Sequence, residues 1–218
     1  MKKDFELLNT WFENASIETI LLHFLQTYKA RIALASSFGA EDQVLSDMIL
    51  RIDPTVKIFT LDTGRLSEET YKVMDQTNHK YGIKVQVYCP DRAALEALYQ
   101  TQGINGFRES IENRKACCQV RKMEPLARAL EGIDVWITGL RRTQSPTRES
   151  MQMIEWDENN RRIKLNPLIE WDEERVWDYI KTHKVPYNAL HDQGYPSIGC
   201  APCTRAIREG EDIRAGRW

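Results

Sequence analysis

The chain has 218 residues, of which 42% are hydrophobic and 28% are charged, proportions that are ordinary for a soluble globular protein. Its net charge of −2 argues against a nucleic-acid partner, and no apolar run approaches the length needed to cross a membrane. The amino end lacks the apolar core of a signal peptide, so we expect a cytoplasmic protein with a single domain over residues 1–218.

Strands and helices alternate along the first two thirds of the chain. The predicted strands cover 31–37, 56–61, 85–88 and 135–140, and the predicted helices cover 16–29, 41–50, a segment capped by Ser67, and 92–100 capped by Asp91. This order predicts an α/β fold in which helices cover both faces of a parallel sheet. Cys89 closes the third strand, so we expect it in the core.

The last third of the chain has a different pattern. Residues 151–156 and 162–165 flank Asn159-Asn160, which is consistent with a hairpin. Asp172 is placed to cap a further helix. After Val185-Pro186 the chain becomes rich in loop-forming residues, and we predict a loop-rich carboxy-terminal lobe that folds back over the domain.

Four of the five cysteines form two pairs that lie far apart in the sequence. Cys117 and Cys118 are adjacent, whereas Cys200 and Cys203 form a CxxC motif. In a reducing compartment such thiols are more often ligands or catalysts than disulfides. Adjacent cysteines favour an iron–sulfur cluster, because a cubane offers a separate iron to each sulfur, while structural zinc sites use spaced cysteines. Zinc, and thiols unrelated to one another, stay open as alternatives.

Polar loops follow three of the predicted strands, where the carboxyl ends of parallel strands meet at one edge of the sheet. The loops are SSFGAED, LDTGR and GLRRTQS. Small residues between a strand and a helix favour a phosphate-like anion, although a turn, a helix cap or a solvated arginine would explain each loop alone. Together they predict a nucleotide-sized site, and its candidate residues are Ser36, Ser37, Gly39, Asp62, Thr63, Gly64, Arg65, Arg141 and Arg142.

Basic residues are concentrated around the first cysteine pair. Between Arg108 and Arg148 there are nine Lys or Arg residues against five Asp or Glu residues, and further arginines follow near the carboxyl end. A local basic surface on a near-neutral protein fits a small anionic ligand. Arg121 and Lys122 lie close behind the paired cysteines, where a cation would balance thiolate charge or attract the anion; a solvated helix face is the alternative.

These motifs resemble the sulfonucleotide reductase family, in particular its cluster-containing adenylyl-sulfate reductases. The likeness runs from about Ile32 to Trp218, and its most specific parts are CCQVRKMEPL, GLRRTQSP, YNALHDQGYPSIGCAPCT and EDIRAGRW. It implies an adenine nucleotide α-hydrolase-like fold, with Lys122 between cluster and substrate. The implied ligands of a [4Fe-4S] cluster are Cys117, Cys118, Cys200 and Cys203. The implied nucleotide contacts are Ser36, Ser37, Phe38, Gly39, Leu61, Asp62, Thr63, Gly64, Arg65, Gly139, Arg141, Arg142, Arg214 and Arg217.

The resemblance also implies a reaction, the thioredoxin-dependent reduction of adenylyl sulfate to sulfite and AMP in sulfate assimilation and cysteine biosynthesis. A cysteine thiolate attacks the sulfur, AMP leaves, and thioredoxin thiols release sulfite from an S-sulfocysteine. The family nucleophile lies in an ECGLH-type segment after RAGRW, so we expect it beyond Trp218. The expected partners are adenylyl sulfate and thioredoxin, without nucleic acid or membrane, and a homo-oligomer is compatible with the sequence.

Three alternatives stay open from the sequence. The chain is either specific for adenylyl sulfate or a reductase that prefers or also accepts phosphoadenylyl sulfate, because no residue here securely reads the 3′ position. ATP-pyrophosphatases share the fold, but they typically carry an SGGxDS-type loop where this chain has SSFGAED. The non-enzymatic alternative is a metal-cluster-binding module that lacks a nucleophile.

Overall fold

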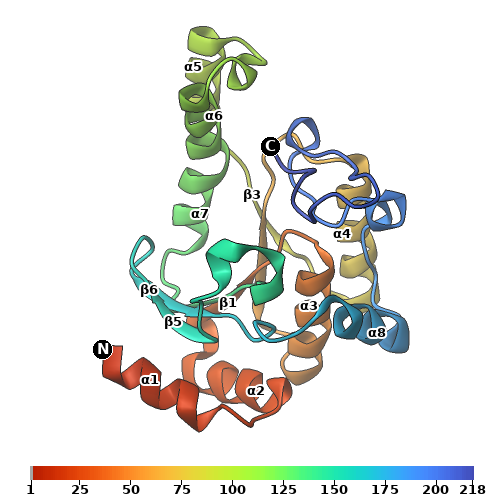
Figure 1. The fold of residues 1–218 in the computed structure, drawn as a ribbon. Helices are drawn as coiled ribbons and strands as arrows, with labels where there is room; N and C mark the ends of the chain where they lie inside the picture. Colours follow the sequence, from red (N-terminus) through yellow and green to blue (C-terminus); the bar gives the residue numbers. More distant parts are fainter. Residues whose placement is uncertain (1) are drawn as a thin grey trace.

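A computed structural model describes residues 2–218 and shows an α/β fold built on one six-stranded sheet (Figure 1). The strand order is β3-β2-β1-β4-β6-β5, and all neighbours are parallel except β5 and β6. The strands are β1 (Ile32–Ala35), β2 (Lys57–Leu61), β3 (Gln86–Tyr88), β4 (Val135–Ile137), β5 (Ile154–Asp157) and β6 (Arg162–Leu165). The predicted fold class is confirmed.

Eight α-helices are present in the described part of the chain. They are α1 (Lys2–Trp11), α2 (Ile17–Tyr28), α3 (Ala40–Ile52), α4 (Glu68–Tyr81), α5 (Arg92–Gln102), α6 (Ile111–Cys118), α7 (Glu124–Ala129) and α8 (Glu173–His183). The predicted caps are confirmed, since Ser67, Asp91 and Asp172 each accept a hydrogen bond from the backbone N–H three residues on. None of these helices combines the length and apolar character that a membrane crossing requires.

The two faces of the sheet are covered unequally, because successive strand residues point to opposite sides. Ile32 and Leu34 of β1 pack into the larger core with residues of α2, α3 and α8. Ala33 and Phe59 face the other side, where a smaller cluster includes Leu130 next to α7. The thinner cover of this second face leaves room beside α7 for a cavity.

Cys89 corrects one sequence prediction, because it is exposed and does not lie in the core. β3, which precedes it, is the edge strand of the sheet, and Val87 within it is 46% exposed. An edge strand has a neighbouring strand on one side only, so a short edge strand and the residue that follows it are more exposed than strands inside the sheet. The local pattern of residues 85–88 predicts a strand but does not give its place in the sheet.

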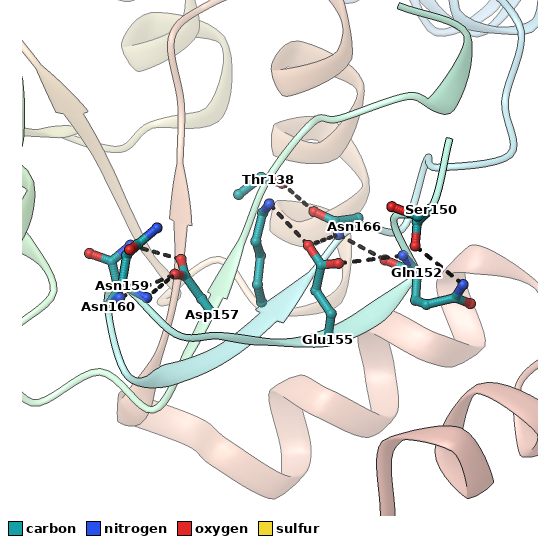
Figure 2. A network of polar contacts seen from close by, with 9 residues as sticks. Thr138, Ser150, Gln152, Glu155, Asp157, Asn159, Asn160 and Asn166 are labelled. Carbon is teal, nitrogen blue, oxygen red and sulfur yellow. Dashed lines mark hydrogen bonds and ion pairs between the residues drawn. The ribbon is translucent and has the colours of Figure 1, made fainter. Parts of the chain in front are cut away.

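The predicted hairpin is formed by β5 and β6, and Figure 2 shows the polar contacts that tie it to β4. The fully buried Asn166 accepts a hydrogen bond from Thr138 Oγ1 at 2.6 Å and donates to the Gln152 carbonyl at 2.9 Å. Asp157 accepts hydrogen bonds in the turn, including one from the side chain of Asn160 at 2.7 Å. The hairpin therefore completes the sheet and holds the end of β4 in place.

Two segments extend from the carboxyl ends of the strands (Figure 1). One is an arm of α5, α6 and α7, in which α6 and α7 are joined by a π-helix, Gln119–Met123. The other is the carboxy-terminal lobe, drawn in blue beside α4, with the short 3₁₀ helices η6 (Ala189–Gln193) and η7 (Ala201–Cys203). The arm carries the first cysteine pair and the lobe carries the second.

Candidate functional site

A cavity of about 480 Å³ lies at the edge of the sheet where the parallel strands end, a volume typical of small-molecule sites. Its wall comes from the loops after β1, β2 and β4, from the start of α7 and from the carboxy-terminal lobe. Ten of the residues that the sequence predicts line it. They are Ser36, Ser37, Gly39, Leu61, Thr63, Lys122, Gly139, Cys200, Arg214 and Arg217.

The loop after β1 is shaped by Phe38, whose backbone has φ +60° although it is not a glycine. The Phe38 ring is 1% exposed and packs into the larger core, so its side chain does not line the cavity. The Phe38 backbone N–H is 3.2 Å from Ser36 Oγ, an acceptor within the same turn. Phe38 therefore anchors the loop, and the small residues around it face the cavity.

Asp42, in the first turn of α3, is a cavity residue that the sequence analysis missed. One of its carboxylate oxygens accepts hydrogen bonds from the backbone N–H of Ser37 at 2.6 Å and from the Ser37 hydroxyl at 2.7 Å. The Gly139 N–H also points at this carboxylate. Burial raises the Asp42 pKa to about 6, and these donors oppose the shift. Asp42 thus ties the loop after β1 to the loop after β4.

The loop after β4 carries the two arginines that the sequence nominates, and both are paired with carboxylates. Arg141 is 4% exposed and donates through Nε to Glu41 at 2.7 Å, while Gln144 donates to the same Glu41 oxygen at 2.8 Å. Arg142 pairs with Glu170. Neither arginine lines the cavity. Arg141 therefore fixes the loop to α3, and Arg142 points toward Glu170 and away from the cavity.

Basic side chains that line the cavity come from four separate segments. Arg148 follows the β4 loop, Arg214 and Arg217 lie in the carboxy-terminal lobe, and Lys122 lies in the π-helix. Lys164 of β6 also lines the cavity, but it is paired with Glu155 at 3.1 Å. Burial and the neighbouring Arg214 lower the pKa values of Arg148 and Arg217. Within residues 2–218, no carboxylate lies within ion-pair distance of these two guanidinium groups. This wall of the cavity is therefore suited to an anion.

The end of the chain is held against the second cysteine pair. Arg217 packs so closely on Gly199 that an added Cβ there would lie 2.4 Å from its guanidinium. Thr204 and Arg217 form an isolated antiparallel bridge, and the Trp218 N–H donates to the Cys203 carbonyl at 3.1 Å. These contacts bring the RAGRW segment to both the cysteines and the cavity.

The four paired cysteines lie near enough to one another to influence each other electrostatically, although the two pairs come from distant parts of the chain. Burial raises the Cys203 pKa, and the neighbouring thiols of Cys200, Cys118 and Cys117 raise it further, while Lys122 lowers it. Burial also raises the Cys117 pKa; Arg121 and Arg65 oppose this shift, and the thiols of Cys118 and Cys200 add to it. Within residues 2–218, no three or more His, Cys, Asp or Glu side chains are arranged closely enough to hold a metal ion. Four thiols are nevertheless a donor set that suits an iron–sulfur cluster, and the nearby cation would balance part of its negative charge.

The LDTGR loop contacts both cysteine segments. Thr63 Oγ1 lies 3.3 Å from Cys200 Sγ, and the Arg65 carbonyl accepts a hydrogen bond from the Ala201 N–H at 2.8 Å. The buried Arg121 donates to the Thr63 carbonyl, so the arm is attached to the same loop. Thr63 reaches the cavity, whereas Asp62, Gly64 and Arg65 do not line it. In this structure the loop connects the arm, the sheet and the lobe.

The cavity residues that the sequence analysis did not predict include Asp42, Arg148 and His191. A signal for Asp42 existed, because a carboxylate in the first turn of a helix can accept hydrogen bonds from the loop that precedes it, as Asp42 does from Ser37. Arg148 lies past the end of the motif that drew attention to Arg141 and Arg142. His191 lies in a loop-rich segment without periodicity, and only the tertiary fold brings it to the cavity.

The fold and the site define a class of protein, an α/β enzyme with an adenine nucleotide α-hydrolase-like fold and with two cysteine pairs near a cavity of nucleotide size. The chain matches the model of the phosphoadenosine phosphosulfate reductase domain over residues 31–206. The chain belongs to this family of enzymes.

Individual relatives agree with this family. The chain is 52% identical over 187 residues to the adenosine 5′-phosphosulfate reductase of Allochromatium vinosum, covering 86% of this chain and 73% of that protein. It is 45% identical over 197 residues to the enzyme of the same name from Agrobacterium fabrum, covering 90% and 76%.

Solved structures show where the fold occurs. The phosphoadenylyl-sulfate reductase of Candida auris, crystallised as a phosphate complex, superposes with a TM-score of 0.81 at 27% identity, covering 95% of this chain and 98% of that one. The FMN adenylyltransferase of Candida glabrata has a TM-score of 0.59 at 15% identity, covering 93% and 70%, and shows the fold alone.

Proposed function

We propose that this chain is the body of a cytoplasmic adenylyl-sulfate reductase that uses thioredoxin to produce sulfite and AMP. The observation that carries the proposal is a nucleotide-sized cavity with a cationic wall, beside which two thiol pairs distant in the sequence influence each other electrostatically. The identity of 42–52% to proteins named adenosine 5′-phosphosulfate reductase favours adenylyl sulfate over its 3′-phosphorylated form.

We assign the four thiols to a [4Fe-4S] cluster held by Cys117, Cys118, Cys200 and Cys203. When bound, the cluster supplies charge next to the substrate and joins the arm to the carboxy-terminal lobe. Lys122 lines the cavity and also lowers the Cys203 pKa, so it lies close to both the cavity and the cysteines. This placement supports an electrostatic role for Lys122 between the thiols and the substrate anion.

The residues of the cavity wall have defined tasks in the proposed reaction. Arg148, Arg214 and Arg217 bind the phosphosulfate and stabilise the charge that develops on the bridging oxygen. A cysteine thiolate expected beyond Trp218 attacks the sulfur, the S–O bond to the phosphate breaks, and its electron pair leaves with AMP. The two thiols of thioredoxin then reduce the S-sulfocysteine, which yields sulfite, the enzyme thiol and a thioredoxin disulfide.

The deciding experiment measures sulfite release from adenylyl sulfate with reduced thioredoxin, using an anaerobically purified chain that continues past Trp218 into the expected cysteine segment. We expect sulfite and AMP in equal amounts, and slower turnover of phosphoadenylyl sulfate. The protein should be brown and contain about four irons per chain, following the ligand count. Exchange of pyrophosphate into ATP without sulfite release, or one zinc and no sulfide, would overturn the assignment.

A further inference from the structure

Two buried polar atoms belong to residues that line the cavity and have no hydrogen-bond partner within residues 2–218. They are Trp136 Nε1 and His191 Nε2. Folded proteins leave few such atoms unpaired, so an unpaired atom beside a cavity indicates a group that a ligand must satisfy. The Trp136 N–H can only donate, whereas the role of His191 depends on where its proton lies.

The imidazole of His191 is held from several sides. The ring hydrogen-bonds to the backbone carbonyl of Tyr195, and its edge contacts Trp177 with ring centroids 5.3 Å apart at 80°. The helix η6 that carries it is anchored by the fully buried Asn188, which donates to Thr70 Oγ1 at 3.0 Å. The ring is therefore fixed before any ligand arrives.

The protonation of His191 follows from these surroundings. Burial lowers its pKa, and nearby Glu41 only partly opposes this, so the ring is neutral and has one N–H near pH 7. A carbonyl only accepts, so this proton lies on the nitrogen that faces Tyr195. Nε2 is left with a lone pair and without a proton. It needs a hydrogen-bond donor.

The chemistry of the proposed substrate limits what this donor can be. The phosphosulfate of adenylyl sulfate has only acceptor oxygens at neutral pH, so its donors are the two ribose hydroxyls and the adenine amino group. Glu41, which is near the His191 ring, lies in the first turn of α3 directly after the anion-binding loop. The ribose is the part of the nucleotide next to the anion, while the amino group is at the far end.

We infer that Nε2 of His191 accepts a hydrogen bond from a ribose hydroxyl of the bound sulfonucleotide, an inference that rests on the function proposed above. His191 is then a binding residue that recognises a ribose hydroxyl and orients the nucleotide. The cationic wall cannot do this, because it reads only the charge of the anion.

The test compares the affinities of AMP, 2′-deoxy-AMP and 3′-deoxy-AMP, measured by titration calorimetry on the folded protein. Wild type should bind one of the deoxy compounds about 3- to 10-fold more weakly than AMP, the range expected for one neutral hydrogen bond. His191→Gln keeps an acceptor near the Nε2 position and should retain part of this discrimination. His191→Asn keeps a donor facing Tyr195, but its shorter side chain places no acceptor at the Nε2 position, so this variant should bind AMP and the deoxy compound equally.

His183→Phe is the matched control, because that ring packs against Tyr179 at 4.2 Å in α8 and does not line this cavity. It should discriminate like wild type. Melting temperatures of all variants identify any that are unfolded. If one of the two His191 variants does not fold, the other still tests the inference. Equal wild-type affinity for all three nucleotides, or unchanged discrimination in His191→Asn, overturns the inference alone. Failure of wild type to bind AMP and adenylyl sulfate overturns the proposed function as well.

Discussion

Replacing Gly139 by alanine tests how the fold builds the cavity. An added Cβ would lie 2.3 Å from Asp42 Oδ1, 2.9 Å from Glu41 Cβ and 3.0 Å from the Asp42 backbone nitrogen. The backbone nitrogen cannot rotate away, so α3 and the β4 loop must separate, and overpacking of this kind costs about 1–3 kcal/mol. Displacing Asp42 from Ser37 removes hydrogen bonds to a charged group, each worth about 1.5–3 kcal/mol. We expect a destabilisation of about 3 kcal/mol or more.

The assay combines urea unfolding with calorimetric titration of AMP. Gly139→Ala should unfold at lower urea and bind AMP at least about tenfold more weakly, since both loops that it separates line the cavity. Gly132→Ala is the control, because no atom lies within 4 Å of the added Cβ and only its φ of +73° is unfavourable for alanine, at about 1 kcal/mol. A Gly139→Ala protein with wild-type midpoint and affinity would refute this account.

Three further predictions concern charge and the cysteines. Burial raises the Asp42 pKa from 3.8 to about 6, so the native state holds this proton more tightly; relative to Asp42→Asn, the unfolding free energy of wild type should fall by up to about 3 kcal/mol between pH 4 and pH 7 in urea titrations. Cys203→Ser should lose iron, sulfide and thermal stability together, whereas Cys89→Ser should keep them; a fully loaded Cys203→Ser protein would show that the ligand set is wrong. Lys122→Ala should slow sulfite release at least about tenfold without lowering the melting temperature, and unchanged turnover would contradict its role.

Much of the fold was predictable because its signals are local. The caps at Ser67, Asp91 and Asp172 lie where a short polar side chain precedes a helical pattern. The strands of the sheet interior are apolar runs, as expected for a parallel sheet that is covered on both sides. The strand predicted over 135–140 ends three residues early, at Ile137, and the following Gly139 lies close to Glu41 and Asp42 of α3.

Other features depend on the order of strands in space, which local patterns do not contain. Cys89 follows an apolar run like the others, but its strand is at the edge of the sheet. The electrostatic influence of Cys200 on Cys117 depends on an arm and a lobe that are distant in the sequence. The family resemblance implies that the four cysteines share one cluster, which stays a prediction, whereas cysteine spacing alone left zinc and unrelated thiols open.

The arginines of the site show why residue type alone does not locate an anion. GLRRTQS places Arg141 and Arg142 where a parallel sheet binds ligands, yet Glu41 and Glu170 neutralise them in the structure. Arg141 forms an ion pair with Glu41 in the wall of the cavity. Its contribution to the cavity is therefore to position the loop that leads to Arg148. A guanidinium that is half-buried beside Arg214, with no carboxylate within ion-pair distance in the described chain, is electrostatically costly until an anion arrives. The cationic wall is therefore stabilised by the ligand that it binds, and anion binding should raise the stability of the lobe that supplies Arg214.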